Sequence, residues 1–292
     1  MHKAGFVNII GNPNVGKSTL MNCLLGEKLS IVTPKAQTTR HRINGILNGE
    51  NYQIVFSDTP GIINPKYKLQ EQMMKFIQTA LEDADIFILI TEIHENFNHT
   101  KILEKLKKSG LPVLVLINKI DLAQQDEVIS KSEEWKKHFP DWYVLPISAL
   151  QSFNITPILD KIIDLLPESP PYYPKDQVSD KTERFFISET IREKILLNYK
   201  KEIPYSVEVT VESFKETETL IRIRCIIYVA RDSQKAILIG HQGKALKNIG
   251  TQARKEIEQF LGRQVFLELH VKVSKNWREN ELKLRNFGYI QK

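Results

Sequence analysis

One eight-residue segment constrains the fold of this chain more than any other. Residues 11–18 read Gly-Asn-Pro-Asn-Val-Gly-Lys-Ser; the apolar run 6–10 precedes them, and apolar residues at helical spacing follow over 20–25. A Gly-x-x-x-x-Gly-Lys-Ser loop between a strand and a helix turns its backbone amides toward a phosphate. The strand before the motif and the helical spacing after it disfavour the alternative of a plain glycine turn. The segment therefore predicts a P-loop.

The residues of this loop have distinct expected tasks. The loop amides and the N-terminus of the following helix would hold the α- and β-phosphates of a nucleotide. Lys17 would reach the β- and γ-phosphates, and Ser18 would bind Mg²⁺. The predicted phosphate-binding residues are Gly11, Asn12, Pro13, Asn14, Val15, Gly16, Lys17, Ser18 and Thr19.

Two later motifs predict which base the site accepts. The strand-like runs 113–117 and 143–147 end in Asn-Lys-Ile-Asp and Ser-Ala-Leu. The Asp121 carboxylate can accept two hydrogen bonds from N1–H and the 2-amino group of guanine, an arrangement that adenine does not offer. Lys119 would lie along the base plane, Asn118 would brace the loop, and the Ala149 N–H would donate to guanine O6. In this order the motifs predict that the site binds a guanine nucleotide. They disfavour the alternative that the chain is a P-loop kinase of small molecules. The predicted base-binding residues are Asn118, Lys119, Asp121, Ser148, Ala149 and Leu150.

The segment between these motifs predicts the switch elements of a phosphoryl-transfer site. Asp58 follows the strand-like run 52–56 and would hold the Mg²⁺ shell, while the Gly61 amide would sense the γ-phosphate. Either Thr38 or Thr39 would complete the Mg²⁺ shell, and spacing does not distinguish them. The predicted metal ligands are Ser18, Thr38 or Thr39, and Asp58. The predicted catalytic residues are Lys17, Thr38, Thr39 and Gly61. The predicted nucleotide-binding set also includes Asp58, Thr59, Pro60, Gly61 and Ile62.

Ile62 departs from the Ras-like pattern. Ras-like enzymes place at this position the glutamine that orients the attacking water. An isoleucine cannot hold that water, so either intrinsic hydrolysis is slow or another group supplies the function. Asn14 offers one hypothesis, because its side-chain oxygen could help bind a monovalent cation such as K⁺ beside the phosphates. The alternative, that Asn14 only caps or shapes the loop, is equally consistent with the sequence.

Length and charge divide the chain into two parts. A chain of 292 residues is expected to form about two domains. Residues 1–180 carry 19 Lys and Arg against 21 Asp and Glu, and residues 181–292 carry 22 against 14, so the net charges are −2 and +8. A basic C-terminal part suggests a polyanionic partner, although a solvated basic face has the same composition. The proline-rich run 167–174 predicts a stiff, extended linker.

Cysteine content and hydropathy restrict the expected compartment. Cys23 and Cys225 make no disulfide framework, which fits a reducing cytoplasm. No N-terminal signal is recognised, and the apolar runs 86–90 and 113–117 are too short to span a bilayer. Peripheral membrane contact remains open.

The C-terminal part predicts a second, RNA-binding fold. A helical pattern over 183–199, alternating strands over 205–214 and 220–229, two helices, a strand over 265–273 and a helix near 277–285 follow in order. A Gly-x-x-Gly loop between the two middle helices, against a three-stranded sheet, is the arrangement of a KH module. The motif alone is weak and favours a plain helix–helix turn, but the element order and the charge favour RNA binding. The predicted RNA-binding residues are Ile237, Ile239, Gly240, His241, Gln242, Gly243, Lys244 and Lys247, with Arg254 as a further source of charge.

Together these motifs resemble the Era family of bacterial ribosome-assembly GTPases, which join a Ras-like G domain to a KH domain. The most specific features are residues 35–42, Lys-Ala-Gln-Thr-Thr-Arg-His-Arg, combined with the loop 239–243. The other matching segments are 11–18, 58–61, 118–121, 148–150, 191–194, 204–207 and 276–278. The order of strands and helices and the proline-rich run predict a doubly wound α/β sheet over 1–168, a linker over 169–180 and a smaller α+β domain over 181–292. The resemblance implies that the first is a P-loop GTPase domain and the last a type II KH domain.

The resemblance also implies a function. Members of this family bind GTP or GDP with Mg²⁺, bind the 3′ end of 16S rRNA through the KH domain, and assist maturation of the 30S subunit. GTP is expected to favour RNA binding, and RNA to stimulate slow hydrolysis, in a monomer with peripheral contact at the inner face of the cell membrane. The alternative is an RNA-binding assembly factor whose nucleotide only sets conformation with little turnover, which Ile62 permits.

Overall fold

The chain forms two compact units in the computed structural model, which describes residues 1–290. The first contains Met1–Asn64 and Met73–Asp180, and the second contains Pro65–Gln72 and the chain from Lys181 onward. Residues 291 and 292, the last two of the predicted C-terminal domain, lie outside the described range. Within that range, none of the helices has both the length and the apolar character that a membrane crossing requires.

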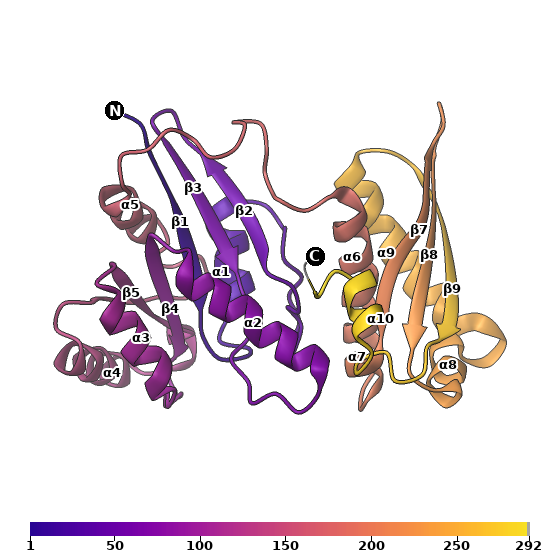
Figure 1. The fold of residues 1–292 in the computed structure, drawn as a ribbon, viewed down its shortest axis with the longest axis horizontal. Helices are drawn as coiled ribbons and strands as arrows, with labels where there is room; N and C mark the ends of the chain where they lie inside the picture. The colour runs from indigo at the N-terminus through magenta and orange to yellow at the C-terminus, as the bar shows by residue number, and fades with distance from the viewer. Residues whose placement is uncertain (291–292) are drawn as a thin grey trace. The chain divides into compact units, whose positions relative to one another are not determined.

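The first unit is built on a six-stranded sheet in the order β2-β3-β1-β4-β5-β6 (Figure 1). Only β2 pairs antiparallel, with β3, and the remaining neighbours are parallel. Parallel strands covered by helices read as continuous apolar runs, which is why the central strands were recognisable in the sequence. The strands are Lys3–Ile10 (β1), Ile43–Asn48 (β2), Tyr52–Asp58 (β3), Ile86–Glu92 (β4), Val113–Asn118 (β5) and Tyr143–Pro146 (β6).

Helices connect these strands and bury their apolar faces on the sheet. Ile77, Leu106 and Trp135, from three successive helices, share one apolar cluster with buried residues of β4 and β5. The carboxyl ends of the parallel strands meet at one edge, where the loops that follow them gather. This arrangement confirms the predicted doubly wound α/β sheet. The helices are Lys17–Leu25 (α1), Lys68–Glu82 (α2), Thr100–Ser109 (α3), Gln125–His138 (α4) and Thr156–Leu165 (α5), with a 3₁₀ turn at Ile120–Leu122 (η1).

The second unit has the predicted α-β-β-α-α-β order around a three-stranded sheet, β7-β8-β9 (Figure 1). β7 is antiparallel to β8, and β9 is parallel to β8. Two predicted bounds were wrong. The chain at 205 does not begin a strand, because Pro204 occupies the first turn of a short helix that proline favours. The last helix begins at Glu281 and not near 277, where the chain forms turns. The elements are Glu183–Asn198 (α6), Ile203–Ser206 (α7), Glu208–Glu216 (β7), Ile221–Val229 (β8), Asp232–Ile239 (α8), His241–Gly243 (η2), Lys244–Leu261 (α9), Val265–Val273 (β9) and Glu281–Asn286 (α10).

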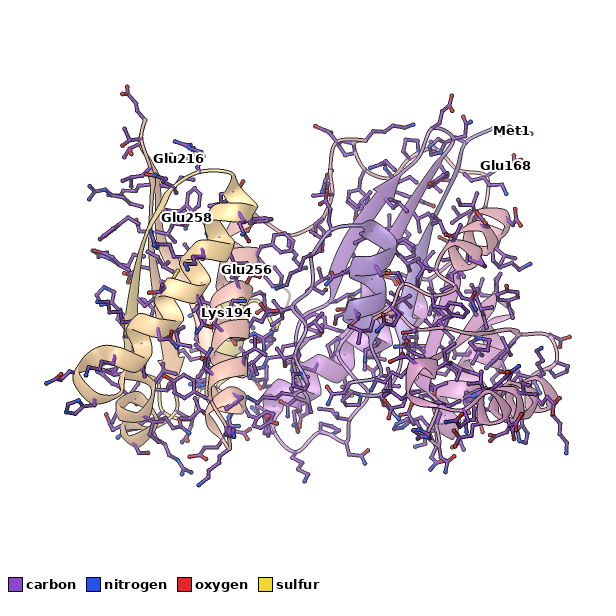
Figure 2. All side chains as sticks on the ribbon, turned by 180° about the vertical axis from the view of Figure 1, so that it is seen from behind. Met1, Glu168, Lys194, Glu216, Glu256 and Glu258 are labelled. Carbon is purple, nitrogen blue, oxygen red and sulfur yellow. The ribbon has the colours of Figure 1, made fainter. Side chains whose placement is uncertain are left out.

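Two sets of polar contacts reinforce the apolar core of this unit. Lys194 on α6 and Glu256 on α9 form an ion pair between the two long helices (Figure 2). The C-terminal tail is fastened at two buried points: Trp277 Nε1 donates to Ser206 O at 3.0 Å, and Tyr289 Oη donates to Glu208 Oε2 at 2.6 Å. The long helices and the tail are therefore fixed to one core.

Residues 169–180, predicted as a linker, lie along the first unit instead of standing free. Gln53 is fully buried; its Oε1 accepts from the N–H groups of Tyr172 and Tyr173 at 2.7 and 2.9 Å. Further along, the N–H of Ile46 in β2 donates to Val178 O at 2.9 Å. The segment is extended, as its prolines suggest, and it covers the edge of β2.

Candidate functional site

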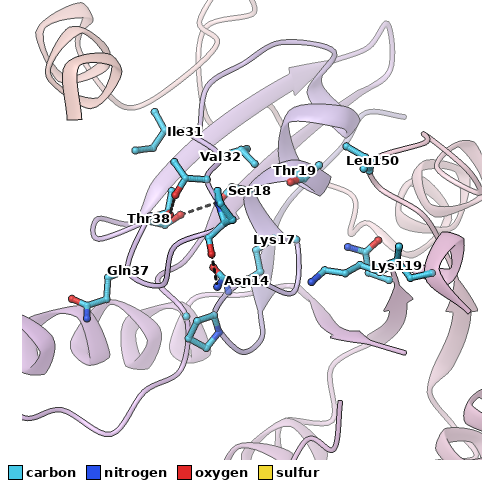
Figure 3. Close-up of a pocket in the computed structure, with 18 of the residues that line it drawn as sticks. Asn14, Lys17, Ser18, Thr19, Ile31, Val32, Gln37, Thr38, Lys119 and Leu150 are labelled. Carbon is cyan, nitrogen blue, oxygen red and sulfur yellow. Dashed lines mark hydrogen bonds between the residues drawn. The ribbon is translucent and has the colours of Figure 1, made fainter. Parts of the chain in front are cut away.

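A pocket of about 520 Å³ opens where the loops after the parallel strands gather (Figure 3). It brings together residues that lie more than a hundred positions apart in the sequence. The predicted residues that line it are Pro13, Asn14, Gly16, Lys17, Ser18, Thr19, Thr38, Thr39, Gly61, Asn118, Lys119, Asp121 and Leu150. The lining residues that sequence reasoning missed are Ile31, Val32, Thr33, Pro34, Gln37 and Leu122. Four of these, Ile31 to Pro34, lie just before the motif at 35–42 in a stretch without a motif of its own, and Gln37 lies within that motif.

The other predicted residues stand behind the pocket wall. Thr59 is fully buried, and its Oγ1 donates to Ile9 O at 2.7 Å. The Ile62 N–H donates to Gly11 O at 3.2 Å, and the Ile62 side chain packs into the apolar core. The predicted residues that do not line the pocket are Gly11, Asn12, Val15, Asp58, Thr59, Pro60, Ile62, Ser148 and Ala149.

The P-loop has the geometry of a phosphate-binding turn. Gly16 has φ of 102°, and a Cβ there would collide with the Asn118 amide nitrogen, so only glycine fits. Lys17 is buried, and its Nζ donates to Gly11 O at 3.1 Å and Asn12 O at 2.7 Å. Burial lowers the pKa of Lys17 to about 8, against the opposing charges of Asp58 and Glu95. The Lys17 ammonium is thus held over the loop in a buried environment, where a bound anion would stabilise its positive charge.

Asn118 joins three of the predicted motifs. Its Nδ2 donates to Val15 O at 2.7 Å, and its Oδ1 accepts from the Ala149 N–H at 2.9 Å. The N–H that we expected to donate to guanine therefore has a partner within the protein. Asp121 accepts from Ser148 Oγ at 2.6 Å, while Lys119 forms an ion pair with Glu92 at the end of β4. The base-reading loops are thereby tied to each other and to the P-loop.

Three hard oxygen donors converge beside the P-loop lysine. Ser18 Oγ lies 2.7 Å from Asp58 Oδ2 and 2.8 Å from Thr39 Oγ1. Asp58 is fully buried, and its Oδ1 has no hydrogen-bond partner among residues 1–290. Burial raises the pKa of the Asp58 carboxyl, against the hydrogen bond from Ser18 and the charge of Lys17. Two hydroxyls and a buried carboxylate that needs a counter-charge form a donor set that fits Mg²⁺.

The geometry also separates the two adjacent threonines. Thr38 Oγ1 lies 2.6 Å from Thr33 Oγ1 and donates to Lys35 O at 2.6 Å. Thr39, in contrast, is within 3.3 Å of Asp58 Oδ2. Thr39 is therefore the threonine that could share an ion with Ser18 and Asp58.

A polar network supports the P-loop from the side of β4. The Asn12 amide donates to Glu95, and His99 Nε2 lies 2.8 Å from Asn12 Oδ1. Thr91 Oγ1 donates to the other oxygen of Glu95 at 2.9 Å. On the opposite side, Asn14 Nδ2 donates to Pro34 O at 3.1 Å. Sequence reasoning missed Glu95 and His99, because they lie in a loop without a recognisable motif.

The second candidate site surrounds the Gly-x-x-Gly loop. Gly240 has φ of 70°, and a Cβ there would lie 2.6 Å from the Ala245 Cβ. His241 and Gln242, between the two glycines, are exposed. Lys244 and Lys247, which follow the loop, are exposed as well. Ile237 is half exposed, whereas Ile239 packs against the core.

A groove of about 360 Å³ runs from this loop along α9. Its lining is Gly243, Leu246, Lys247, Gly250, Thr251, Arg254, Leu267 and Leu269. Of the predicted RNA-binding residues, only Gly243 and Lys247 line it, together with Arg254. Ile237 and Ile239, the expected groove residues, do not. The helical spacing of the α9 residues is visible in the sequence, but their apposition to alternate residues of β9 is a tertiary contact.

β9 turns backbone polar groups toward this groove. The Ile221 N–H donates to Gln264 O at 2.9 Å, so the even-numbered residues of the strand pair with β8. The backbone N–H and C=O groups of the odd-numbered residues point away from β8. The Val265 N–H, for example, donates to the Glu258 side chain of α9 at 3.0 Å. The groove therefore combines an apolar floor, Leu267 and Leu269, with backbone donors and acceptors and a basic rim.

Fold and sites together define a P-loop protein of the GTPase class that carries a C-terminal KH domain. A family model described as a 50S ribosome-binding GTPase matches residues 6–119, and a KH domain model matches residues 202–278. The GTPase Era of Staphylococcus haemolyticus is 45% identical over 293 residues, covering 99% of this chain and 98% of that protein. The chain belongs to the Era family of GTPases.

Two solved structures match at the level of the whole chain. A crystal structure of Era in complex with MgGDPNP and nucleotides 1506–1542 of 16S ribosomal RNA has a TM-score of 0.95 and 39% identity, with 100% of each chain covered. A crystal structure of a single-residue variant of Aquifex aeolicus Era bound to GDP·AlF4⁻ has a TM-score of 0.95 and 39% identity, covering 99% of this chain and 100% of that one.

Proposed function

We propose that this chain is a GTP-hydrolysing, RNA-binding switch that binds the 3′ region of 16S rRNA and assists maturation of the 30S subunit. The observation that carries the proposal is the presence of two built sites in one chain. One is a phosphate loop beside a cluster of hard oxygens, and the other is a Gly-x-x-Gly loop beside an open groove. The Era structure that this chain resembles contains both MgGDPNP and 16S rRNA nucleotides.

The nucleotide roles follow from the geometry of the first site. The P-loop amides and the Lys17 ammonium would bind the phosphates, and Asp121 would read guanine. Ser18, Thr39 and Asp58 would hold Mg²⁺, which supplies charge neutralisation at the phosphates when it is bound. The Gly61 N–H would contact the γ-phosphate, so that the two switch segments respond to whether GTP or GDP is present.

Hydrolysis by this site alone should be slow. Ile62 is only 7% exposed and belongs to the apolar core, so it offers no polar group to orient water. A cation held by Asn14, or contacts made when RNA binds, would supply the missing function. The same observation favours the second candidate function, an RNA-binding assembly factor in which nucleotide sets conformation with little turnover.

The RNA roles follow from the second site. The Gly-x-x-Gly backbone would pass close to the phosphates of a single strand, with Lys244, Lys247 and Arg254 supplying charge. Unstacked bases would lie in the groove between α9 and β9. We propose residues 1–168 as the G domain and 181–292 as the RNA-binding domain, with 169–180 connecting them. By resemblance to the family, the proposal extends to a monomer in the cytoplasm with peripheral contact at the inner membrane face.

The test is phosphate release by the full chain with and without 16S rRNA nucleotides 1506–1542. Replacing His241 and Gln242 by Asp keeps both glycines but places two negative charges where phosphates should pass. Repulsion at surface dielectric costs about 1 kcal/mol or more per charge, so RNA affinity should fall roughly 30- to 100-fold. Basal phosphate release should be unchanged, and stimulation by RNA should disappear.

A matched control carries the same charge change elsewhere in the KH domain. Thr219→Asp with Gln259→Asp adds two carboxylates at exposed positions, in the β7–β8 turn and on the solvent face of α9. This variant should keep nearly all RNA stimulation. If RNA binds the parent chain tightly but leaves phosphate release unchanged, the second candidate function replaces the first. If RNA does not bind, the proposed RNA-binding function is wrong.

A further inference from the structure

Helix α9 carries a glycine in its interior that the folded protein does not require. Gly250 lies well inside Lys244–Leu261, and a Cβ built on it meets only Leu269, at 3.4 Å, which is ordinary van der Waals contact. Its neighbours Gly240, Gly243 and Gly262 differ, because each has a positive φ that excludes other residues. Glycine is much less favourable than alanine inside a helix. Stability alone would therefore favour alanine at position 250.

The position of Gly250 supplies a reason for the missing side chain. Gly243, Lys247, Gly250 and Arg254 recur at helical spacing along the face of α9 that lines the groove. Gly250 is central in this series, with a cationic residue about one turn away on either side. Opposite it, Leu269 of β9 forms part of the apolar floor. A side chain at position 250 would enter the groove at the point where helix and strand face each other.

The groove at Gly250 has the chemistry of a slot for a flat, polar-edged ring. Its floor is apolar, the odd-numbered residues of β9 present backbone donors and acceptors along one side, and Lys247 and Arg254 flank it with positive charge. An unstacked nucleobase matches this combination, because its face is apolar, its edge is polar and it lies between two phosphates.

We propose that Gly250 is a specificity-determining residue of the RNA groove: because it has no side chain, one RNA base can lie over the helix backbone at this position and against the edge of Leu269, between Lys247 and Arg254. The proposal rests on the RNA-binding function proposed above and adds to it the residue that admits the base. It predicts opposite effects of one substitution on stability and on binding. A purely structural glycine would not behave in this way.

The test is Gly250→Ala in the full chain, with 16S rRNA nucleotides 1506–1542 as the probe. The added methyl should raise the thermal midpoint of the KH domain by about 4 °C, because alanine favours the helix. It should also weaken RNA binding about 10-fold or more, the typical effect of one misplaced methyl group in a fitted pocket. The salt dependence of binding should stay the same, because no charge changes. Gly250→Leu should weaken binding further.

Asn248→Ala is the matched control. It is an exposed residue two positions away, about 200° around the helix from Gly250 and so on the face opposite the groove. Alanine should stabilise the helix there as well, without changing RNA affinity.

The outcomes separate the two proposals. If the parent chain does not bind the RNA, both proposals fail. If the parent binds and Gly250→Ala binds equally well, this inference alone fails. A lowered thermal midpoint in Gly250→Ala would show that the glycine is a packing residue, which also overturns the inference.

Discussion

Nucleotide binding by this chain should take up a proton above pH 8, because of the environment of one lysine. In the folded protein without nucleotide, burial lowers the pKa of Lys17 from 10.5 to about 8. Phosphates at the P-loop would place negative charge beside the ammonium and restore its proton. Protonation and nucleotide binding are therefore linked at this one residue.

The size of the effect follows from the pKa. With a pKa of about 8, Lys17 is half deprotonated in the free protein at pH 8 and about 90% deprotonated at pH 9. Binding of GDP should therefore take up about 0.5 proton at pH 8 and about 0.9 at pH 9. The affinity should fall about fivefold over that interval. Isothermal titration calorimetry in two buffers that differ in ionisation enthalpy measures this uptake directly.

Asp121→Asn is the control for this linkage, because it weakens recognition of the base and leaves Lys17 in place. The variant should bind GDP more weakly but take up the same fraction of a proton. Absence of proton uptake at pH 9 in the parent chain would refute the assignment of Lys17 as a buried lysine that binds phosphate.

The same pKa has a consequence for stability without nucleotide. An unfolded lysine keeps its proton up to about pH 10.5, whereas the native Lys17 loses it near pH 8. Between these values the unfolded state binds more protons, so the Lys17 contribution to stability rises with pH, by about 3 kcal/mol in total. Urea unfolding of the parent chain and of Lys17→Met across this range should differ by this rise.

Three further predictions concern the base, the cation and the connecting segment. Asp121→Asn should reduce GTP affinity on the order of 10⁴-fold and let xanthine nucleotides compete, because a paired acceptor is lost; competition binding with both nucleotides checks this. If Asn14 helps hold a cation, phosphate release should be faster in KCl than in NaCl at equal ionic strength, and equal rates would leave Asn14 as a loop-shaping residue. Gln53→Met should destabilise the first unit by about 2–3 kcal/mol and expose residues 172–180 to protease, because it removes the bonds to Tyr172 and Tyr173; unchanged resistance would contradict the docking of this segment.

Sequence reasoning succeeded where a structural element or a site is specified by residues that are close together in the chain. The bounds of the strand over 265–273 were predicted to the residue, because apolar residues alternate with other residues along a half-buried strand. The P-loop was equally readable, since its two glycines and its lysine lie within the eight residues 11–18. In both cases the chemistry and the local conformation are specified within about ten residues.

Sequence reasoning failed where a function depends on distant residues meeting. To tell which of Thr38 and Thr39 is the candidate metal ligand, one must know which hydroxyl lies near Asp58. Gly250 is unremarkable along the chain until β9 is placed opposite it. The Ala149 N–H has a partner in Asn118, 31 positions earlier, that spacing could not reveal. Such contacts belong to the packing of elements, which no single window of sequence encodes.

The segment 169–180 shows how a physical rule could have closed one of these gaps. Prolines made it read as a linker, and an extended conformation was the correct part of that prediction. β2 is an edge strand of the sheet, however, and an uncovered edge exposes unpaired N–H and C=O groups that favour aggregation. A proline-rich chain leaving the same unit is well suited to cover such an edge, because it is already extended and cannot itself extend the sheet far. Since β2 directly follows the segment that contains Thr38 and Thr39, the covering segment is hydrogen-bonded to the strand that continues from the predicted switch segment.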